Sequence, residues 1–248
     1  MQHCELLSSA SAALSGDLNG ADFSVPVATC PGWDLKQLVL HMGTSQRWVA
    51  AMIRDGRGEP LKPADLDSEL PASDEDLGRW YAGSARALLA ALSETKPDAY
   101  AWSWRTDQQR VSFWARRMLF ETVVHGADAR LVLGMQPAVE AGVAADGIDE
   151  LLESLPYLRA VRPAIADLRG QGESLHFHCT DAEGEWMVRL EPAGLAWEHG
   201  HGKGDVAVRG AAGDLLLLLY GRYDPSDSRF QCFGDRALLQ RWLEHSKV

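Results

Sequence analysis

Residues 116–128 (RRMLFETVVHGAD) most constrain the fold, because this stretch places a carboxylate and an imidazole on one face of a predicted helix. Glu121 and His125 are four residues apart, and Asp128 follows one turn later. Apolar residues extend the same stripe, namely Trp114, Met118 and Val132. We therefore expect an inward-facing stripe. Charged groups buried there need partners, and a divalent metal ion bound to Glu121 and His125 would satisfy both.

The first half of the chain predicts four helices, since apolar residues recur there at helical spacing. Asp34 is a good N-cap with Gln37 closing a capping box, Ser73 is the expected cap of the third helix, and Gly134 ends the fourth. A loop with three prolines is expected over 56–71. The predicted helices are 4–18, 34–54, 73–97 and 108–133. This pattern is typical of a four-helix bundle.

The second half predicts a small α+β domain. A helix is expected over 143–155 and a closing helix after Asp235, and alternating apolar and polar residues predict several strands. The expected strands are 175–180, 185–190, 195–198, 205–209 and 230–233. Residues 215–220 are apolar on all sides and favour a buried helix, a strand of that length being the alternative. The predicted domains are therefore 1–138 and 139–248.

A third metal ligand is available on the helix predicted over 34–54. His41 lies at the edge of its apolar face, so that His41, Glu121 and His125 would give two imidazoles and one carboxylate. Three protein ligands leave a coordination position open, as in catalytic zinc sites. A water bound there would have a pKa of about 7, and a bound thiol would be deprotonated. Asp128 could orient an imidazole by accepting a hydrogen bond from it, without itself binding the metal. The alternative is a helix-face pair without a metal.

Charge and cysteine usage exclude several classes of protein. The net charge is −11 and the pI is about 5.1, which disfavours nucleic acid and anionic membranes as partners. The four cysteines form no C-x-x-C pair, and neither a signal peptide nor a membrane span is expected. We therefore expect a reduced, cytoplasmic, soluble protein, whose oligomeric state is not readable from the sequence.

Three motifs together resemble a known family. The turn TCPGWD at 29–34, His41 in the following helix, and ETVVH at 121–125 with Asp128 are similar to the mycothiol-dependent maleylpyruvate isomerase family. That family belongs to the DinB-like group of four-helix metalloproteins. In the second half, residues 179–181, 185–186 and 205–222 resemble the family's C-terminal domain, which is similar to sterol carrier folds.

The resemblance implies a cofactor and a chemistry. A metal, usually zinc, would be held by His41, Glu121 and His125, and its open position would take the thiol of mycothiol as thiolate. In the isomerase, the thiolate adds to an activated double bond, the bond rotates and the thiol leaves, so that cis becomes trans. Other relatives stop at S-conjugation and act as thiol transferases. The implied partners are therefore a thiol and a small electrophile.

The same resemblance implies further pocket residues. Arg222 matches a Gly-Arg motif and is expected to hold the acidic substrate. The alternative for Arg222 is a helix C-terminal cation favoured by the helix dipole. Trp48, on the His41 side of its helix, is expected to line the pocket. Many relatives have an Arg-Trp pair where this chain has Gly126 and Ala127, which opens space beside the metal.

Two other functions remain open from the residues. One is a metal-dependent hydrolase that uses bound water on the same three ligands, with Asp128 as the available general base. The other is a non-catalytic module that holds an apolar ligand in the second domain. Zinc, nickel, iron and manganese all suit imidazole and carboxylate ligands.

Four other histidines and one cysteine are not assigned to a site. His176, His178, His199 and His201 could make a second metal site, but strand alternation favours Leu175, Phe177 and Cys179 inside and the histidines on the polar face. Cys30 is interpreted as a buried structural thiol with no base nearby.

Overall fold

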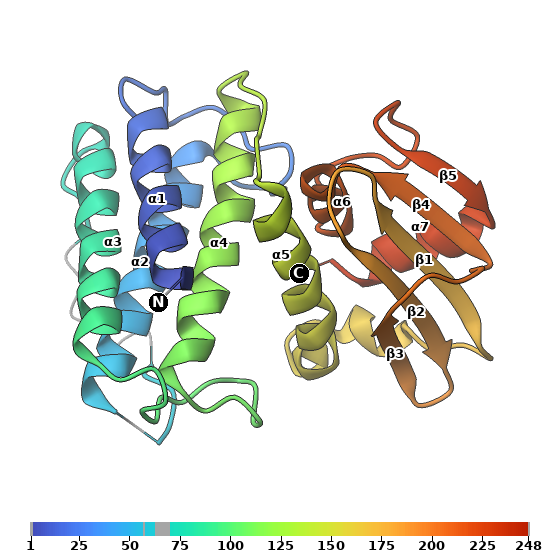
Figure 1. Cartoon of the computed structure of the whole chain (residues 1–248). Coiled ribbons are helices and arrows are strands. Elements are labelled where there is room, and N and C mark those ends of the chain that lie inside the picture. The colour runs from blue at the N-terminus through green and yellow to red at the C-terminus, as the bar shows by residue number, and fades with distance from the viewer. Residues whose placement is uncertain (1, 57, 63–69, 248) are drawn as a thin grey trace. The chain divides into compact units, whose positions relative to one another are not determined.

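The computed structural model describes residues 2–56, 58–62 and 70–247. The chain divides into two compact units, Met1–Pro137 and Ala138–Val248 (Figure 1). The predicted loop over 56–71 falls partly on residues 57 and 63–69, which lie outside the described residues. The predicted fold class, a helical N-terminal part followed by a small α+β part, is confirmed.

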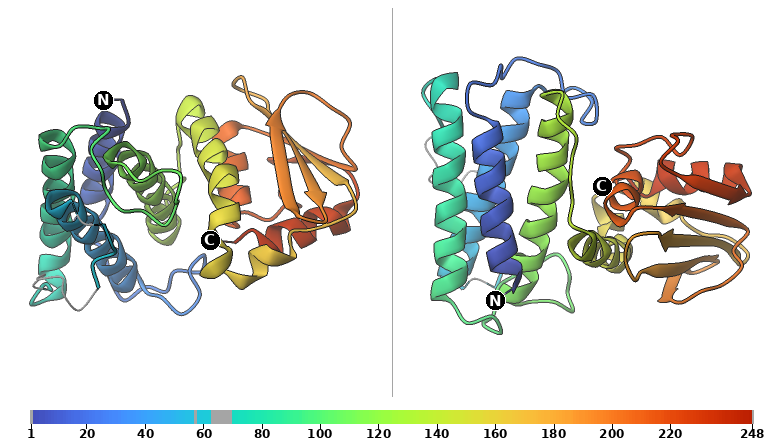
Figure 2. Two further views of the ribbon diagram at one scale, coloured as in Figure 1. Left: turned by 90° about the horizontal axis from the view of Figure 1, so that it is seen from below. Right: turned by 45° about the horizontal axis from the view of Figure 1, so that its top comes forward.

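The N-terminal unit is a bundle of long helices that run beside one another (Figure 2). They are α1 (Gln2–Asp17), α2 (Leu35–Asp55), α3 (Leu77–Glu94) and α4 (Val111–Val132). Part of its core is an apolar cluster that includes Leu14, Leu38, Met42, Leu77 and Tyr81, each at most 2 % exposed. These residues repeat at helical spacing in the sequence, which explains why the four helices could be predicted.

The start of α2 is fixed by the predicted capping box. The Asp34 carboxylate accepts from the Gln37 backbone N–H at 2.8 Å, and the Gln37 side chain accepts from the Asp34 N–H at 2.9 Å. Gly56 ends the helix in the left-handed conformation, with φ of 56°. Since both ends are set locally, the position of His41 along α2 follows from the sequence.

The start of α3 differs from the prediction. Ser73 donates its hydroxyl to the Asp76 side chain instead of capping the helix, and a short 3-10 turn, η2 (Asp74–Asp76), comes first. Ser73 was the expected cap because serine favours that position. Here the carboxylate three residues on competes for the hydroxyl, so α3 begins only at Leu77.

The C-terminal unit contains a five-stranded sheet in the order β3-β2-β1-β4-β5. Its strands are β1 (Glu173–Cys179), β2 (Glu185–Glu191), β3 (Gly194–His199), β4 (Val206–Gly210) and β5 (Gln231–Gly234). All neighbouring strands are antiparallel except β1 and β4, which are parallel. The helical elements are α5 (Ala141–Ser154), η3 (Leu155–Ala160), η4 (Pro163–Asp167), α6 (Ala212–Leu219) and α7 (Arg236–His245).

One face of this sheet packs against helices. Phe177 of β1 contacts Trp242 of α7, with ring centroids 6.1 Å apart, and Trp186 of β2 donates its indole N–H to Asp149 of α5 at 2.6 Å. Phe177 and Trp186 are directly opposite in register and therefore share a face.

The prediction that residues 215–220 favour a helix is confirmed, since α6 ends at Leu219 and its leucines are buried.

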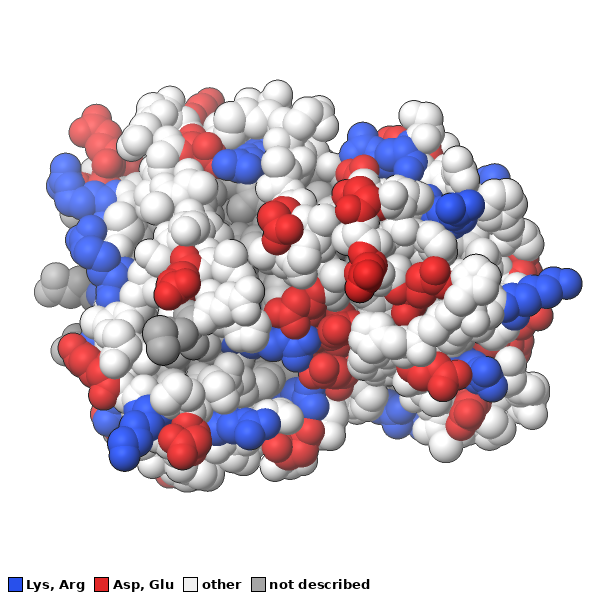
Figure 3. All heavy atoms as spheres, in the orientation of Figure 1, with Lys and Arg blue, Asp and Glu red and all other residues white. Residues whose placement is uncertain are grey.

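None of the helices among the described residues is both long and apolar enough to cross a membrane. On the face shown in Figure 3, basic side chains are interspersed with acidic ones.

Candidate metal centre

The bundle brings the three predicted metal ligands together from two helices. Nε2 of His41 on α2 lies 2.9 Å from Oε1 of Glu121 on α4, and Nε2 of His125 lies 3.5 Å from the same oxygen. The two imidazole rings are 5.1 Å apart. The three side chains are partly buried, at 36 % exposed for His41, 20 % for Glu121 and 14 % for His125. Two imidazoles thus converge on one carboxylate oxygen.

Arg117 holds the other oxygen of that carboxylate. Its Nη2 donates to Oε2 of Glu121 at 2.6 Å, one turn earlier on α4. Burial alone would raise the pKa of Glu121, but hydrogen bonds from His125 and His41 and the charge of Arg117 hold it well below the usual range. Glu121 is therefore an anion with one oxygen anchored and the other directed at the histidines.

Asp128 is fully buried and lies behind His125. Its Oδ2 is 2.8 Å from Nδ1 of His125, and its Oδ1 accepts from the Thr29 hydroxyl at 2.6 Å. Burial lowers the pKa of His125, but hydrogen bonds with Asp128, Cys30 and Glu121 outweigh it, so the pKa lies well above its ordinary value. Asp128 therefore orients the imidazole through Nδ1 and leaves Nε2 directed at Glu121.

The turn at 29–34 contributes two further residues to this centre besides Thr29, and sequence reasoning placed none of the three there. The Cys30 thiol donates to Oδ2 of Asp128 at 3.4 Å and is only half-buried, so the interpretation of Cys30 as a buried thiol with no base nearby was wrong. The ring of Trp33 lies 4.9 Å from that of His41 and 6.3 Å from that of His125. The available signal was the turn itself, since it directly precedes the helix that carries His41.

The donor set fits a divalent metal ion. One donor atom from each of His41, Glu121 and His125 lies within 4.8 Å of the others. The donor atoms of a second possible group, Cys30, His125 and Asp128, also lie within 4.8 Å of one another. It shares His125 with the first, and both oxygens of Asp128 already accept hydrogen bonds there. An ion at the first group would use Nε2 of His125 and leave the Nδ1 contact with Asp128 in place.

Comparison with known proteins identifies the family. The model of the mycothiol maleylpyruvate isomerase N-terminal domain matches residues 4–130, and that of the MDMPI C-terminal domain matches residues 142–241. This chain belongs to the mycothiol maleylpyruvate isomerase family. The resemblance stated from the sequence is therefore confirmed, and with it the expectation of an enzyme from a family linked to mycothiol.

Two solved structures share the fold over most of the chain. A mycothiol-dependent maleylpyruvate isomerase is 15 % identical, with a TM-score of 0.60 over 93 % of this chain and 91 % of that one. A histidine-to-alanine mutant of a mycothiol-dependent maleylpyruvate isomerase is 14 % identical, with a TM-score of 0.58 over 90 % and 89 % of the two chains. No curated protein sequence matches this chain.

The other two predicted site residues, Trp48 and Arg222, each donate a hydrogen bond to a backbone carbonyl. Trp48 donates its indole N–H to the Leu61 carbonyl at 2.7 Å and packs edge-on against Trp102 and Trp114. Arg222 belongs to the C-terminal unit, where its Nη1 donates to the Tyr220 carbonyl at 2.6 Å. The pocket role of Trp48 and the substrate role of Arg222 stay predictions.

Gly126 directly follows His125 on α4, at a position where the sequence predicted open space. A Cβ built on Gly126 would meet no atom within 4 Å. There is therefore open space at Gly126 itself, whereas the neighbouring Ala127 is buried, and the position of that space beside a metal ion stays a prediction.

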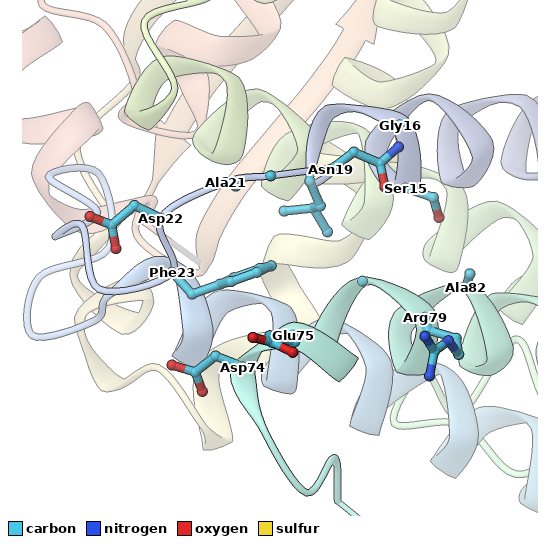
Figure 4. Close-up of a pocket in the computed structure, with 13 residues that line it drawn as sticks. Ser15, Gly16, Asn19, Ala21, Asp22, Phe23, Asp74, Glu75, Arg79 and Ala82 are labelled. Carbon is cyan, nitrogen blue, oxygen red and sulfur yellow. The ribbon is translucent and has the colours of Figure 1, made fainter.

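A surface cavity of about 810 Å³ lies elsewhere in the bundle, between the end of α1 and the start of α3. Figure 4 shows Phe23, Asp74, Glu75 and Arg79 around it. None of the three predicted metal ligands lines this cavity, so we do not assign it to the candidate centre.

Proposed function

We propose that this family member is a metal-dependent enzyme that uses mycothiol as a nucleophile toward a small electrophile, either as a cis-trans isomerase of the maleylpyruvate type or as a thiol S-transferase. The observation that carries the proposal is the convergence of His41 and His125 on one oxygen of Glu121. That arrangement presents two imidazoles and one carboxylate, which leaves room for an exogenous ligand on a four-coordinate ion.

We propose zinc as the ion and His41, Glu121 and His125 as the residues that hold it. Zinc is commonly bound by three protein ligands in catalytic sites, and when bound it lowers the pKa of a coordinated thiol so that the thiolate forms at neutral pH. The family name supports mycothiol as the source of that thiol.

The chain's own residues prepare these ligands. The Asp128 carboxylate accepts a hydrogen bond from Nδ1–H of His125, so that an ion that displaces the Nε2 proton would meet a lone pair on that nitrogen. Thr29 and Cys30 donate to Asp128 and keep its carboxylate in place. Arg117 keeps Glu121 ionised and fixes its rotamer. Each proposed ligand on α4 is thus oriented before any ion binds.

The electrophile is the least constrained part of the proposal. The open space at Gly126 favours a substrate that reaches toward His125 on the side where many relatives carry a larger residue. We retain Arg222 as the residue that binds an acidic group of the substrate, and Trp48 as a residue that lines the pocket.

The hydrolase alternative is weaker because of the contacts of Asp128. That reaction needs a general base beside the bound water, and Asp128 was the candidate. Its carboxylate is fully buried and is held by His125, Thr29 and Cys30. For the binding-module alternative, the apolar run 215–219 offers no surface to a ligand, because it is at most 1 % exposed within α6.

The test combines metal content with thiol dependence. Wild type, His125→Ala and the control His245→Ala are compared by elemental analysis and by turnover of maleylpyruvate with and without mycothiol. We expect His125→Ala to lose one zinc per chain and all thiol-dependent turnover, whereas the control keeps both. Accumulation of a mycothiol conjugate without the trans product would show that the enzyme is an S-transferase and not an isomerase. Full zinc retention in His125→Ala, or turnover that is indifferent to mycothiol, would contradict the proposal.

A further inference from the structure

A second group of metal-ligating side chains lies on the sheet of the C-terminal unit. His176 and His178 are two residues apart on β1 and share a face. The register places Glu185 of β2 directly opposite His178, and therefore on that same face. This is the face opposite to Phe177, which packs against α7. The third histidine, His201, lies in the loop that follows β3.

The chain beyond β3 brings His201 to this group. The Gly200 N–H donates to the Glu185 carbonyl at 3.1 Å, with Gly200 at a φ of 152°. A Cβ on Gly204 would lie 3.1 Å from the backbone nitrogen of His176, so the loop packs closely on β1. The loop therefore covers His176 and holds His201 beside Glu185.

All three imidazoles contact one carboxylate. Nε2 of His176 lies 3.1 Å and Nδ1 of His201 lies 2.7 Å from Oε2 of Glu185, while Nδ1 of His178 lies 3.1 Å from Oε1. We call these four residues the sheet cluster. One donor atom from each lies within 4.8 Å of all the others, and the ring centroids are 5.3 to 6.2 Å apart.

Strand alternation places His176 and His178 on the polar face opposite Phe177, as the sequence predicted, but the loop after β3 covers part of that face. His176 is only 5 % exposed, whereas the side chain of His201 is 77 % exposed. His199 does not join them, because its Nε2 lies 3.2 Å from Asp149. The cluster thus has a buried inner end and an open outer end through which an ion can enter.

We propose that the sheet cluster binds a divalent transition-metal ion, a second site in addition to the one proposed in the bundle. Three imidazoles with one carboxylate suit zinc, copper or nickel rather than calcium or magnesium. Zinc–nitrogen distances of about 2.0–2.1 Å place ligand atoms about 3.4 Å apart in a tetrahedron. The donor atoms lie within 4.8 Å of one another, so no pair needs to close by more than about 1.4 Å, which rotation of the exposed His201 and small shifts of the others can supply.

The ligand count points to the role of this ion. Four protein ligands fill a tetrahedral zinc sphere and leave no position for substrate, which is the pattern of a structural site. The ion would tie the loop after β3 to β1 and β2. Zinc should therefore stabilise the C-terminal unit, since a ligand that binds only the folded state raises its stability.

The test uses the full chain stripped of metal and then dialysed against Zn²⁺ alone. The variants are His201→Ala, on the exposed loop, and Glu185→Gln, with His199→Ala as a matched control from the same segment. We expect wild type and His199→Ala to bind one more zinc per chain than His201→Ala, and Glu185→Gln to bind that zinc at least tenfold more weakly. The bundle ligands are untouched in all three, so mycothiol-dependent turnover reports on the other site separately.

A second measurement separates metal binding from a hydrogen-bonded cluster. Zinc should raise the Tm of wild type and of His199→Ala more than that of His201→Ala. Equal zinc content and equal zinc-induced Tm shifts in wild type and His201→Ala would overturn the proposal, because Glu185 would then serve only as a hydrogen-bond partner of the histidines.

Discussion

Nδ1 of His125 lies 2.8 Å from Oδ2 of Asp128, one turn further along α4. The same carboxylate accepts from Thr29 and Cys30, which come from the turn before α2. A buried carboxylate is costly without such partners, and here the partners also tie the turn to α4. The relationship therefore links the orientation of a proposed metal ligand to the packing of the bundle.

Replacing Asp128 should weaken metal binding without removing a ligand. Asp128→Asn keeps the size of the side chain but removes the charge that orients His125. We expect about a 10–100-fold loss of zinc affinity, as for other residues that hold a ligating histidine. Competition with a chromophoric chelator measures it, with Asp98→Asn, an exposed acid, as the control. Equal affinity in both variants would show that Asp128 does not act through His125.

Two glycines of the bundle should respond in opposite ways to alanine. A Cβ on Gly43 would clash with the ring of Trp80, so Gly43→Ala forces α2 and α3 apart and should cost about 1–3 kcal/mol. Gly126 has open space, and Gly126→Ala should add about 0.5–1 kcal/mol through helix propensity. Urea unfolding of the metal-free proteins measures both. A destabilised Gly126→Ala would mean that this space is not free.

The capping box at the start of α2 should make a measurable contribution to the free energy of unfolding. Asp34→Ala removes the acceptor of the Gln37 N–H and should cost about 1 kcal/mol of unfolding free energy. Gln37→Ala removes only the reciprocal bond and should cost less. Both are read from urea midpoints at constant m-value. The order would be reversed if the Gln37 side chain carried most of the cap.

Cys179 should resist alkylation in the folded protein. Burial, with the charges of Asp181 and Glu185, raises the pKa of its thiol to about 12. The thiolate is then about 10⁻⁴ of the total at pH 8, against about a quarter for an ordinary thiol with a pKa of about 8.5. Mass spectrometry after brief iodoacetamide treatment should find Cys179 unmodified in the native protein and modified in urea. Rapid native labelling would contradict the buried position.

Much of the fold follows from local patterns. The apolar spacing of α2, its capping box and the apolar run of α6 are each contained in short stretches of sequence. Ser73 shows where local rules were insufficient, because a neighbouring carboxylate took the hydroxyl that was expected to cap α3. The choice between two local partners depends on small energy differences that the pattern does not contain.

The sequence by itself determined that Glu121 and His125 share a helix face, because backbone geometry fixes a four-residue spacing. Only the tertiary structure decided that His41 shares one oxygen of Glu121 with His125, and that Thr29 and Asp128, 99 residues apart, are in contact. The sheet cluster likewise depends on strand register and on the course of the loop after β3. Local spacing is set by the covalent chain, whereas contacts between distant segments are set by how whole elements pack.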